Sequence, residues 1–211
     1  MLNGNTMAED PVLNSPALKL IIICVVSYLI GSVSFSVIIG RIFFKKDVRD
    51  NGSGNAGATN MARVFGLVPG AAVLVLDTLK TAAALIIGSR ICGEWGLCAG
   101  GICCLTGHCF PVFHGFKGGK GVSASLAVIF AVSWKVGICV CFTFAVCAVL
   151  SKKVSLASLM ASTAALCAAV LGNLPLPKTV LLLFAAVLVF VRHIENIKRL
   201  LNGTEKDFKA K

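Results

Sequence analysis

The chain has 211 residues, of which 57% are apolar and only 14% are charged. This composition, with a mean hydropathy of +0.89, excludes a soluble domain, because a soluble domain of this length covers its surface with polar side chains. The formal net charge of +11 does not indicate nucleic-acid binding, since no basic segment carries interleaved aromatic residues. The sequence therefore predicts an all-α integral membrane protein.

Seven apolar segments follow one another along the chain, separated by polar breaks. They lie near residues 18–42, 67–89, 95–110, 122–133, 136–150, 154–172 and 179–191. Each predicts a membrane helix, which gives about seven transmembrane helices in a single multi-pass domain, residues 18–211. Several segments are shorter than the ~20 residues that a straight helix needs to cross the hydrocarbon core, so 95–110 and 122–133 are alternatively a re-entrant pair. Residues 1–17 form a polar N-terminal extension.

Lysine and arginine set the expected orientation. Most of the 20 basic residues fall on one side of the predicted bundle, in the segments 41–63, 117–120, 152–153 and 192–211. Cytoplasmic loops retain positive charge, so this side and the C-terminus are predicted to be cytoplasmic and the N-terminus to lie outside. The lipid bilayer is the expected partner, with anionic headgroups attracted nonspecifically to the basic loops.

Three polar strings interrupt the apolar segments, all on the predicted cytoplasmic side. The first runs from Gly52 to Asn60 as Gly-Ser-Gly-Asn-Ala-Gly-Ala-Thr-Asn. Its glycines free backbone N–H groups to converge on an anion, and Thr59 or Asn60 is expected to cap a helix that carries Arg63 in its first turns. The alternative is a flexible loop, but such a loop does not need an arginine one turn inside the following helix.

The second string, from Gly115 to Gly121, combines four glycines with Lys117 and Lys120. It is not a Walker loop, because it is one residue short and Gly121 replaces the Ser or Thr that would hold magnesium. We interpret it as a second anion site at a helix N-terminus. A basic turn that obeys the positive-inside rule would explain the two lysines but not the four glycines.

The third string follows the last apolar segment. His193, Asn196 and Arg199 recur every third residue and are expected to line one face of a juxtamembrane helix that Gly203 ends. This stripe is alternatively the solvated face of the helix. A functional face is favoured because histidine and asparagine stand where lysine and glutamate would serve.

A charged pair lies inside the second apolar segment. Asp77 and Lys80 are three residues apart, on one helix face. Charges in lipid are costly, so the two side chains either neutralise each other or contact something functional, and we favour a structural pair. His108 remains open between a hydrogen-bonding residue at a helix end and a site residue.

The three strings together resemble motifs of the bacterial membrane glycerol-3-phosphate acyltransferases that use acyl phosphate as donor. That family carries the patterns Ser-Gly-Asn-x-Gly-Ala-Thr-Asn-x-x-Arg, Gly-His-x-Phe-Pro-Val-Phe followed by Phe-Lys-Gly-Gly-Lys-Gly-Val, and His-x-x-Asn-Ile-x-Arg-Leu-x-x-Gly-x-Glu. Here they read Ser53–Arg63, Gly107–Val122 and His193–Glu205. One departure is Ala56, where the family frequently has proline, and the N-terminal extension also lies outside the family pattern.

The resemblance implies transfer of a fatty acyl group from acyl phosphate to the 1-hydroxyl of sn-glycerol 3-phosphate, which gives lysophosphatidic acid and phosphate, without a cofactor or metal. The residues matched to acyl-phosphate binding are Ser53, Gly54, Asn55, Gly57, Thr59, Gly118 and Gly119. Those matched to glycerol 3-phosphate are Arg63, Lys120, His193 and Asn196, with a hydroxyl contact from Ser155 or Ser158. The resemblance also implies a bacterial inner membrane and a possible cytoplasmic enzyme that produces the acyl phosphate.

The sequence lacks the usual acyltransferase nucleophiles and bases. No His is followed five residues later by Asp, and no G-x-S-x-G elbow is present. Since acyl phosphate carries an activated carbonyl, we favour direct transfer in which a donor phosphate oxygen accepts the hydroxyl proton, with His193 as the alternative base. The rival class is a transporter of a phosphorylated solute, but we find neither paired repeats nor broken helices near the midplane.

Overall fold

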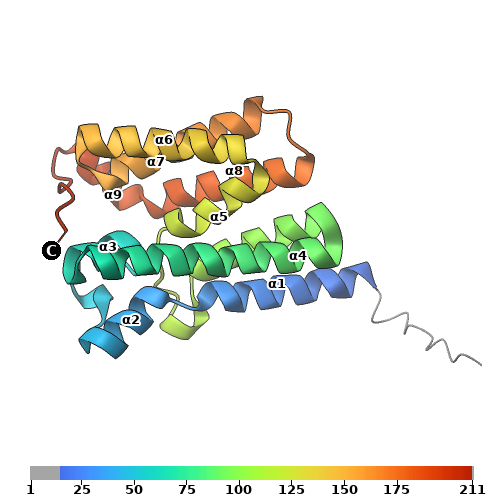
Figure 1. Cartoon of the computed structure of the whole chain (residues 1–211), viewed down its shortest axis with the longest axis horizontal. Coiled ribbons are helices and arrows are strands. Elements are labelled where there is room, and N and C mark those ends of the chain that lie inside the picture. Colours follow the sequence, from blue (N-terminus) through green and yellow to red (C-terminus); the bar gives the residue numbers. More distant parts are fainter. Residues whose placement is uncertain (1–14, 211) are drawn as a thin grey trace, which may run out of the picture.

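A computed structural model describes residues 15–210, and within them every regular element is helical (Figure 1). Of the predicted N-terminal extension, residues 1–14 lie outside the described part. The α-helices are α1 (Pro16–Ser32), α2 (Phe35–Phe44), α3 (Ala58–Phe65), α4 (Leu67–Cys109), α5 (Val122–Val132), α6 (Trp134–Ser151), α7 (Val154–Leu171), α8 (Leu176–Arg192) and α9 (Ile194–Leu201). The predicted all-α class is confirmed.

Helix α4 is a hairpin of two arms rather than one rod. Its backbone leaves helical geometry at Cys92 and at Gly93, whose φ is 57°. Gly88 and Gly96 then face each other so closely that a Cβ on Gly88 would lie 2.1 Å from the Gly96 carbonyl oxygen. The two arms match the predicted segments 67–89 and 95–110. Glycines on both arms let the two backbones approach closely.

The helices form two groups with α5 between them (Figure 1). One group contains α1 and the α4 hairpin, and a Cβ on Gly31 of α1 would lie only 2.2 Å from the Cys104 carbonyl oxygen of α4. The other contains α6, α7 and α8. The core that joins the groups is made of aliphatic side chains such as Leu105, Val128 and Leu182, all fully buried.

The outside of the bundle is also apolar, as expected in lipid. Large side chains such as Ile86, Phe142 and Val149 are exposed at 59%, 69% and 76%. Within the described residues, four helical stretches are long and apolar enough to cross a membrane, or five if α8 and α9 count as one span with a 57° bend. The α4 hairpin is one of these stretches, and α5 is too short to be counted. Seven crossings and their orientation therefore stay predictions.

Candidate active site

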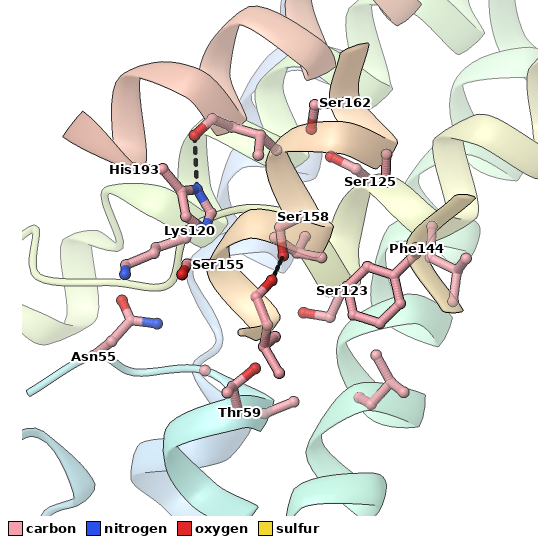
Figure 2. Close-up of a pocket in the computed structure, with 18 of the residues that line it drawn as sticks. Asn55, Thr59, Lys120, Ser123, Ser125, Phe144, Ser155, Ser158, Ser162 and His193 are labelled. Carbon is pink, nitrogen blue, oxygen red and sulfur yellow. Dashed lines mark hydrogen bonds between the residues drawn. The ribbon is translucent and has the colours of Figure 1, made fainter. Parts of the chain in front are cut away.

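One large pocket of about 910 Å³ opens at the end of the bundle where α3 and α9 lie (Figure 1). All three polar strings contribute to its lining. Figure 2 shows Asn55, Lys120 and His193 at one end of this pocket and Phe144 at the opposite end. Beyond the polar mouth the walls are mainly apolar, and they include Ile129, Val140, Phe144, Ala161, Ala165, Leu182 and Ala185.

Asn60 fixes the loop of the first string. Its buried side chain accepts a hydrogen bond from the Ser53 backbone N–H at 2.8 Å and donates to the carbonyl oxygens of Val48 and Asn51 at 2.9 and 3.0 Å. The prediction that Thr59 or Asn60 caps the helix was wrong. Gly57 is the N-cap of α3 and no side chain caps it, because the Asn60 amide instead satisfies backbone groups of the preceding loop.

The first string brings Thr59 and Arg63 into the pocket from one face of α3, and Asn55 from the loop before it. Within residues 15–210 Arg63 makes no ion pair, so its charge remains available to an anion. Ser53 and Gly57 also line the pocket, whereas Gly54 lines only an adjoining outer cavity of about 530 Å³.

The second string places its two central glycines against His108. Gly119 donates its backbone N–H to the His108 carbonyl oxygen at 3.1 Å, so this N–H is already used. Gly118 lines the outer cavity and Gly119 lines neither cavity. The Arg192 guanidinium donates to the Gly119 carbonyl oxygen at 3.2 Å. This packing directs the next residue, Lys120, into the main pocket.

Lys120 is a cation that lacks a carboxylate partner in the described part of the chain. Its ammonium donates a hydrogen bond to Asn196 Oδ1. Burial lowers the pKa of Lys120 to about 8, and the nearby Arg199 adds to the shift. A phosphate bound here would counter both effects, since it supplies the missing negative charge.

His193 lies just past α8, where the chain bends into α9. Its Nδ1 donates to the Val189 carbonyl oxygen at 2.8 Å, so Nε2, which has no hydrogen-bond partner in residues 15–210, is an acceptor beside the pocket. Burial lowers the pKa of His193 to about 4, so the imidazole is neutral near pH 7.

The third string presents one face to the pocket. Asn196 and Arg199 of α9 line the pocket with His193, which confirms their predicted shared face, and Gly203 follows the helix with a φ of 69°. Sequence reasoning gave no role to Glu205, although it ends the third motif. Its carboxylate accepts hydrogen bonds from Asn196 Nδ2 and Arg199 Nε, both at 2.7 Å. Burial opposes ionisation of Glu205, but its hydrogen-bond donors lower its pKa.

Both candidate serines of α7 reach the pocket (Figure 2). Ser155 donates to Glu205 Oε1 at 2.6 Å, whereas Ser158 donates to the Val154 carbonyl oxygen of its own helix at 2.8 Å. Further hydroxyl groups come from positions that sequence reasoning missed, since serines inside apolar helices give no local signal. They are Ser123, Ser125 and Ser162.

The mouth of the pocket is strongly cationic. The basic side chains that line it are Arg63, Lys120, Arg199 and Lys206, against the single carboxylate of Glu205. Arg199 forms an ion pair with this carboxylate at 2.7 Å. A cationic mouth that leads into an apolar interior suits ligands that combine a phosphate group with a long apolar chain.

Comparison with known proteins gives the same family throughout. The sequence model of the glycerol-3-phosphate acyltransferase family matches residues 21–203. The glycerol-3-phosphate acyltransferase of Jannaschia sp. (strain CCS1) is 40% identical over 196 residues, which cover 92% of this chain and 96% of the relative. That of Thermotoga petrophila is 43% identical over 185 residues, covering 86% of this chain and 93% of the relative.

Two solved structures are similar to this fold. The crystal structure of PlsY (YgiH), an integral membrane glycerol 3-phosphate acyltransferase, in its glycerol 3-phosphate form superimposes with a TM-score of 0.85 at 36% identity and covers 90% of this chain and 96% of that chain. The lysophosphatidic acid form superimposes with a TM-score of 0.81 at 37% identity, over 90% of this chain and 95% of that chain.

Proposed function

Since the chain belongs to the glycerol-3-phosphate acyltransferase family and is an integral membrane protein, we propose that its acyl donor is acyl phosphate. The fatty acyl group would pass to the 1-hydroxyl of sn-glycerol 3-phosphate, giving lysophosphatidic acid and inorganic phosphate. We place this reaction at a bacterial inner membrane, with a cytoplasmic enzyme supplying the acyl phosphate.

The cationic mouth of the pocket is the observation that carries this proposal. Arg63 enters from α3 and Lys120 from the loop before α5, and neither has a carboxylate partner in residues 15–210. With Arg199 and Lys206 beside them, these cations suit a mouth that receives two phosphate groups. Acyl phosphate brings a second phosphate to the acceptor's own, bonded directly to the acyl carbonyl, whereas a thioester has sulfur at that position.

We assign the two substrates to different groups of residues at the mouth of the pocket. We assign the acyl phosphate to the first-string loop, through Ser53, Asn55, Gly57 and Thr59, with Gly54 and Gly118 toward the outer cavity. Gly119 could bind acyl phosphate through its backbone N–H only if the hydrogen bond from this N–H to the His108 carbonyl oxygen were broken. We assign glycerol 3-phosphate to a second group of residues, which comprises Arg63, Lys120, Ser155, His193 and Asn196. Ser158 is the alternative to Ser155 for the hydroxyl contact to glycerol 3-phosphate.

The proposed reaction is a single displacement. The 1-hydroxyl oxygen of glycerol 3-phosphate attacks the acyl carbonyl, the carbonyl–oxygen bond to phosphate breaks, and the hydroxyl proton passes to a donor phosphate oxygen. His193 Nε2 helps to orient the acceptor by accepting a hydrogen bond from the other hydroxyl of glycerol 3-phosphate, while the proton of the attacking 1-hydroxyl faces the donor phosphate. The basic side chains at the mouth stabilise the departing phosphate, so the protein contributes positioning and electrostatics.

A donor comparison tests the proposal. Purified protein in lipid nanodiscs is given glycerol 3-phosphate with palmitoyl phosphate, palmitoyl-CoA or palmitoyl carrier protein, and both lysophosphatidic acid and phosphate are measured. We expect lysophosphatidic acid and phosphate in equal amounts when palmitoyl phosphate is the donor, and neither product with the two thioester donors. Lysophosphatidic acid formed from a thioester at a comparable rate would contradict the proposed donor.

Acceptor binding is expected to weaken at alkaline pH. Since the pKa of Lys120 is lowered to about 8, the ammonium is present below this pH and is lost as the pH rises through it. The KM for glycerol 3-phosphate should therefore rise above pH 8, by up to tenfold per pH unit, while the substrate phosphate stays dianionic. Initial rates between pH 6.5 and 9.5 measure this, and a flat acceptor KM would contradict a phosphate ligand whose pKa is lowered to about 8.

A branched side chain at Gly57 is expected to abolish activity. Gly57 has a φ of −145°, which any residue can adopt, so the effect comes from the side chain itself. A Cβ there would lie 2.9 Å from Asn55 Nδ2 and push this amide from its place in the pocket. Gly57→Val should insert and unfold at the wild-type temperature while turnover collapses, and Gly57→Ala should lose less. Near-normal turnover of Gly57→Val would identify the loop as a linker.

A further inference from the structure

A buried polar cluster lies beneath the second-string loop. Asp77, which is 1% exposed, is paired with Lys80 at 2.9 Å, as the sequence predicts. Lys80 also donates to the Val33 carbonyl oxygen at the break between α1 and α2. The carboxylate has two further neighbours, which a simple ion pair does not require. His108 Nδ1 lies 3.6 Å from Asp77 Oδ1, and Ser123 Oγ donates to Oδ2 at 3.2 Å.

His108 supports the loop from below. The Gly119 backbone N–H bonds to the His108 carbonyl oxygen, and a Cβ on Gly119 would lie 2.2 Å from His108 Nε2. A Cβ on Gly118 would lie 2.2 Å from the His108 carbonyl oxygen. The two glycines thus lie directly on this residue, and the next residue along the chain is Lys120. The position of the His108 ring therefore limits how closely the loop that carries Lys120 can pack.

Ser123 supports the other side of the same lysine. It lies in the first turn of α5, and its carbonyl oxygen accepts a hydrogen bond from Thr78 Oγ1 at 3.1 Å. Together with the Ser123 hydroxyl bond to Asp77, this fixes the start of α5 to the first arm of α4. The Asp77 carboxylate therefore contacts His108, which lies under the glycines that precede Lys120, and Ser123, which follows Lys120 by three residues in the chain.

We propose that Asp77 is a positioning residue for the acyl acceptor, which acts through His108 and Ser123 to hold Lys120 at the glycerol 3-phosphate site. The inference rests on the proposed role of Lys120. It differs from a purely structural pair in one testable respect. A structural pair needs Asp77 only while Lys80 is charged, whereas a positioning residue is needed even when Lys80 carries no charge.

Two double-mutant cycles separate these roles. We expect Asp77→Asn to raise the KM for glycerol 3-phosphate about tenfold, the scale of coupling within one hydrogen-bond network, with the donor KM unchanged. Asp77→Asn combined with Lys80→Met should keep the raised acceptor KM. In a Lys120→Ala background, Asp77→Asn should cause no further rise. Glu94→Gln, which removes the partly exposed Lys178–Glu94 ion pair at 3.1 Å, is the control and should leave all constants unchanged.

Three results would overturn the inference: an unchanged acceptor KM in folded Asp77→Asn, restoration of wild-type KM by Lys80→Met, or additive effects of the Asp77 and Lys120 changes. If Asp77→Asn does not fold, Ser123→Ala keeps the charged pair intact, and its effect on acceptor KM must likewise vanish in the Lys120→Ala background. Failure of the proposed donor is a separate outcome, since it is visible in the wild-type protein before any variant is made.

Discussion

Lys120→Ala is expected to lower kcat/KM for glycerol 3-phosphate by roughly 30-fold to 1000-fold, which corresponds to about 2–4 kcal/mol for a charge-assisted contact in a secluded site. Most of this loss should be a rise in acceptor KM, because the lysine is proposed to hold the phosphate and not the reacting hydroxyl. Arg63→Ala should behave in the same way, since Arg63 also lines the mouth without an ion pair in residues 15–210.

Steady-state kinetics with glycerol 3-phosphate varied at saturating donor measure this effect. The matched control is Lys117→Ala, which removes the same charge from the same loop at an exposed position outside the main pocket. It should change the acceptor KM by less than about threefold, because exposed charges are well screened. Equal effects of the two substitutions would mean that the loop attracts substrate only by its net charge. Normal acceptor kinetics for Lys120→Ala would remove Lys120 from the site.

The positions of the helices follow largely from the sequence, because polar residues mark where each apolar segment ends. The predicted segment 154–172 corresponds to α7, Val154–Leu171, and 122–133 corresponds to α5, Val122–Val132. The break of the first segment between α1 and α2 could not be predicted in this way. Its Val33 carbonyl oxygen, freed from the helix, is satisfied by Lys80 from α4, and such a long-range contact leaves no local pattern.

Site residues can be predicted from the sequence where their spacing points to a single structural role. The histidine–asparagine–arginine stripe of α9 was found because its spacing matches the helix period. Asn60 was misinterpreted because asparagine serves equally well as a helix cap or as a clamp on a neighbouring loop, and only the fold decides between them. The support of the second-string loop by Asp77 was likewise hidden, since His108 and Ser123 reach it from distant parts of the sequence.

His193→Gln separates the two possible bases. If the donor phosphate accepts the hydroxyl proton, this variant should keep kcat within about tenfold at saturating acceptor and raise the acceptor KM, because glutamine can replace the hydrogen bond but cannot take up a proton near neutrality. If His193 is the obligatory base, kcat should fall by roughly 10²–10⁴. We expect the first result, since burial lowers the pKa of His193 to about 4 and makes it a weak proton acceptor.

The pH profile supplies the second half of this test. With a pKa of about 4, His193 is protonated only well below neutrality, so we expect no loss of kcat/KM near pH 6 from its titration. The substrate phosphates do titrate near pH 6, and a limb of that origin must persist in His193→Gln. His114→Gln is the matched control, because His114 lies outside both cavities, and it should reproduce the wild-type profile. Loss of several decades of kcat in His193→Gln, together with loss of its low-pH limb, would contradict donor-phosphate assistance and assign the proton to His193, while the acceptor assignment would stand.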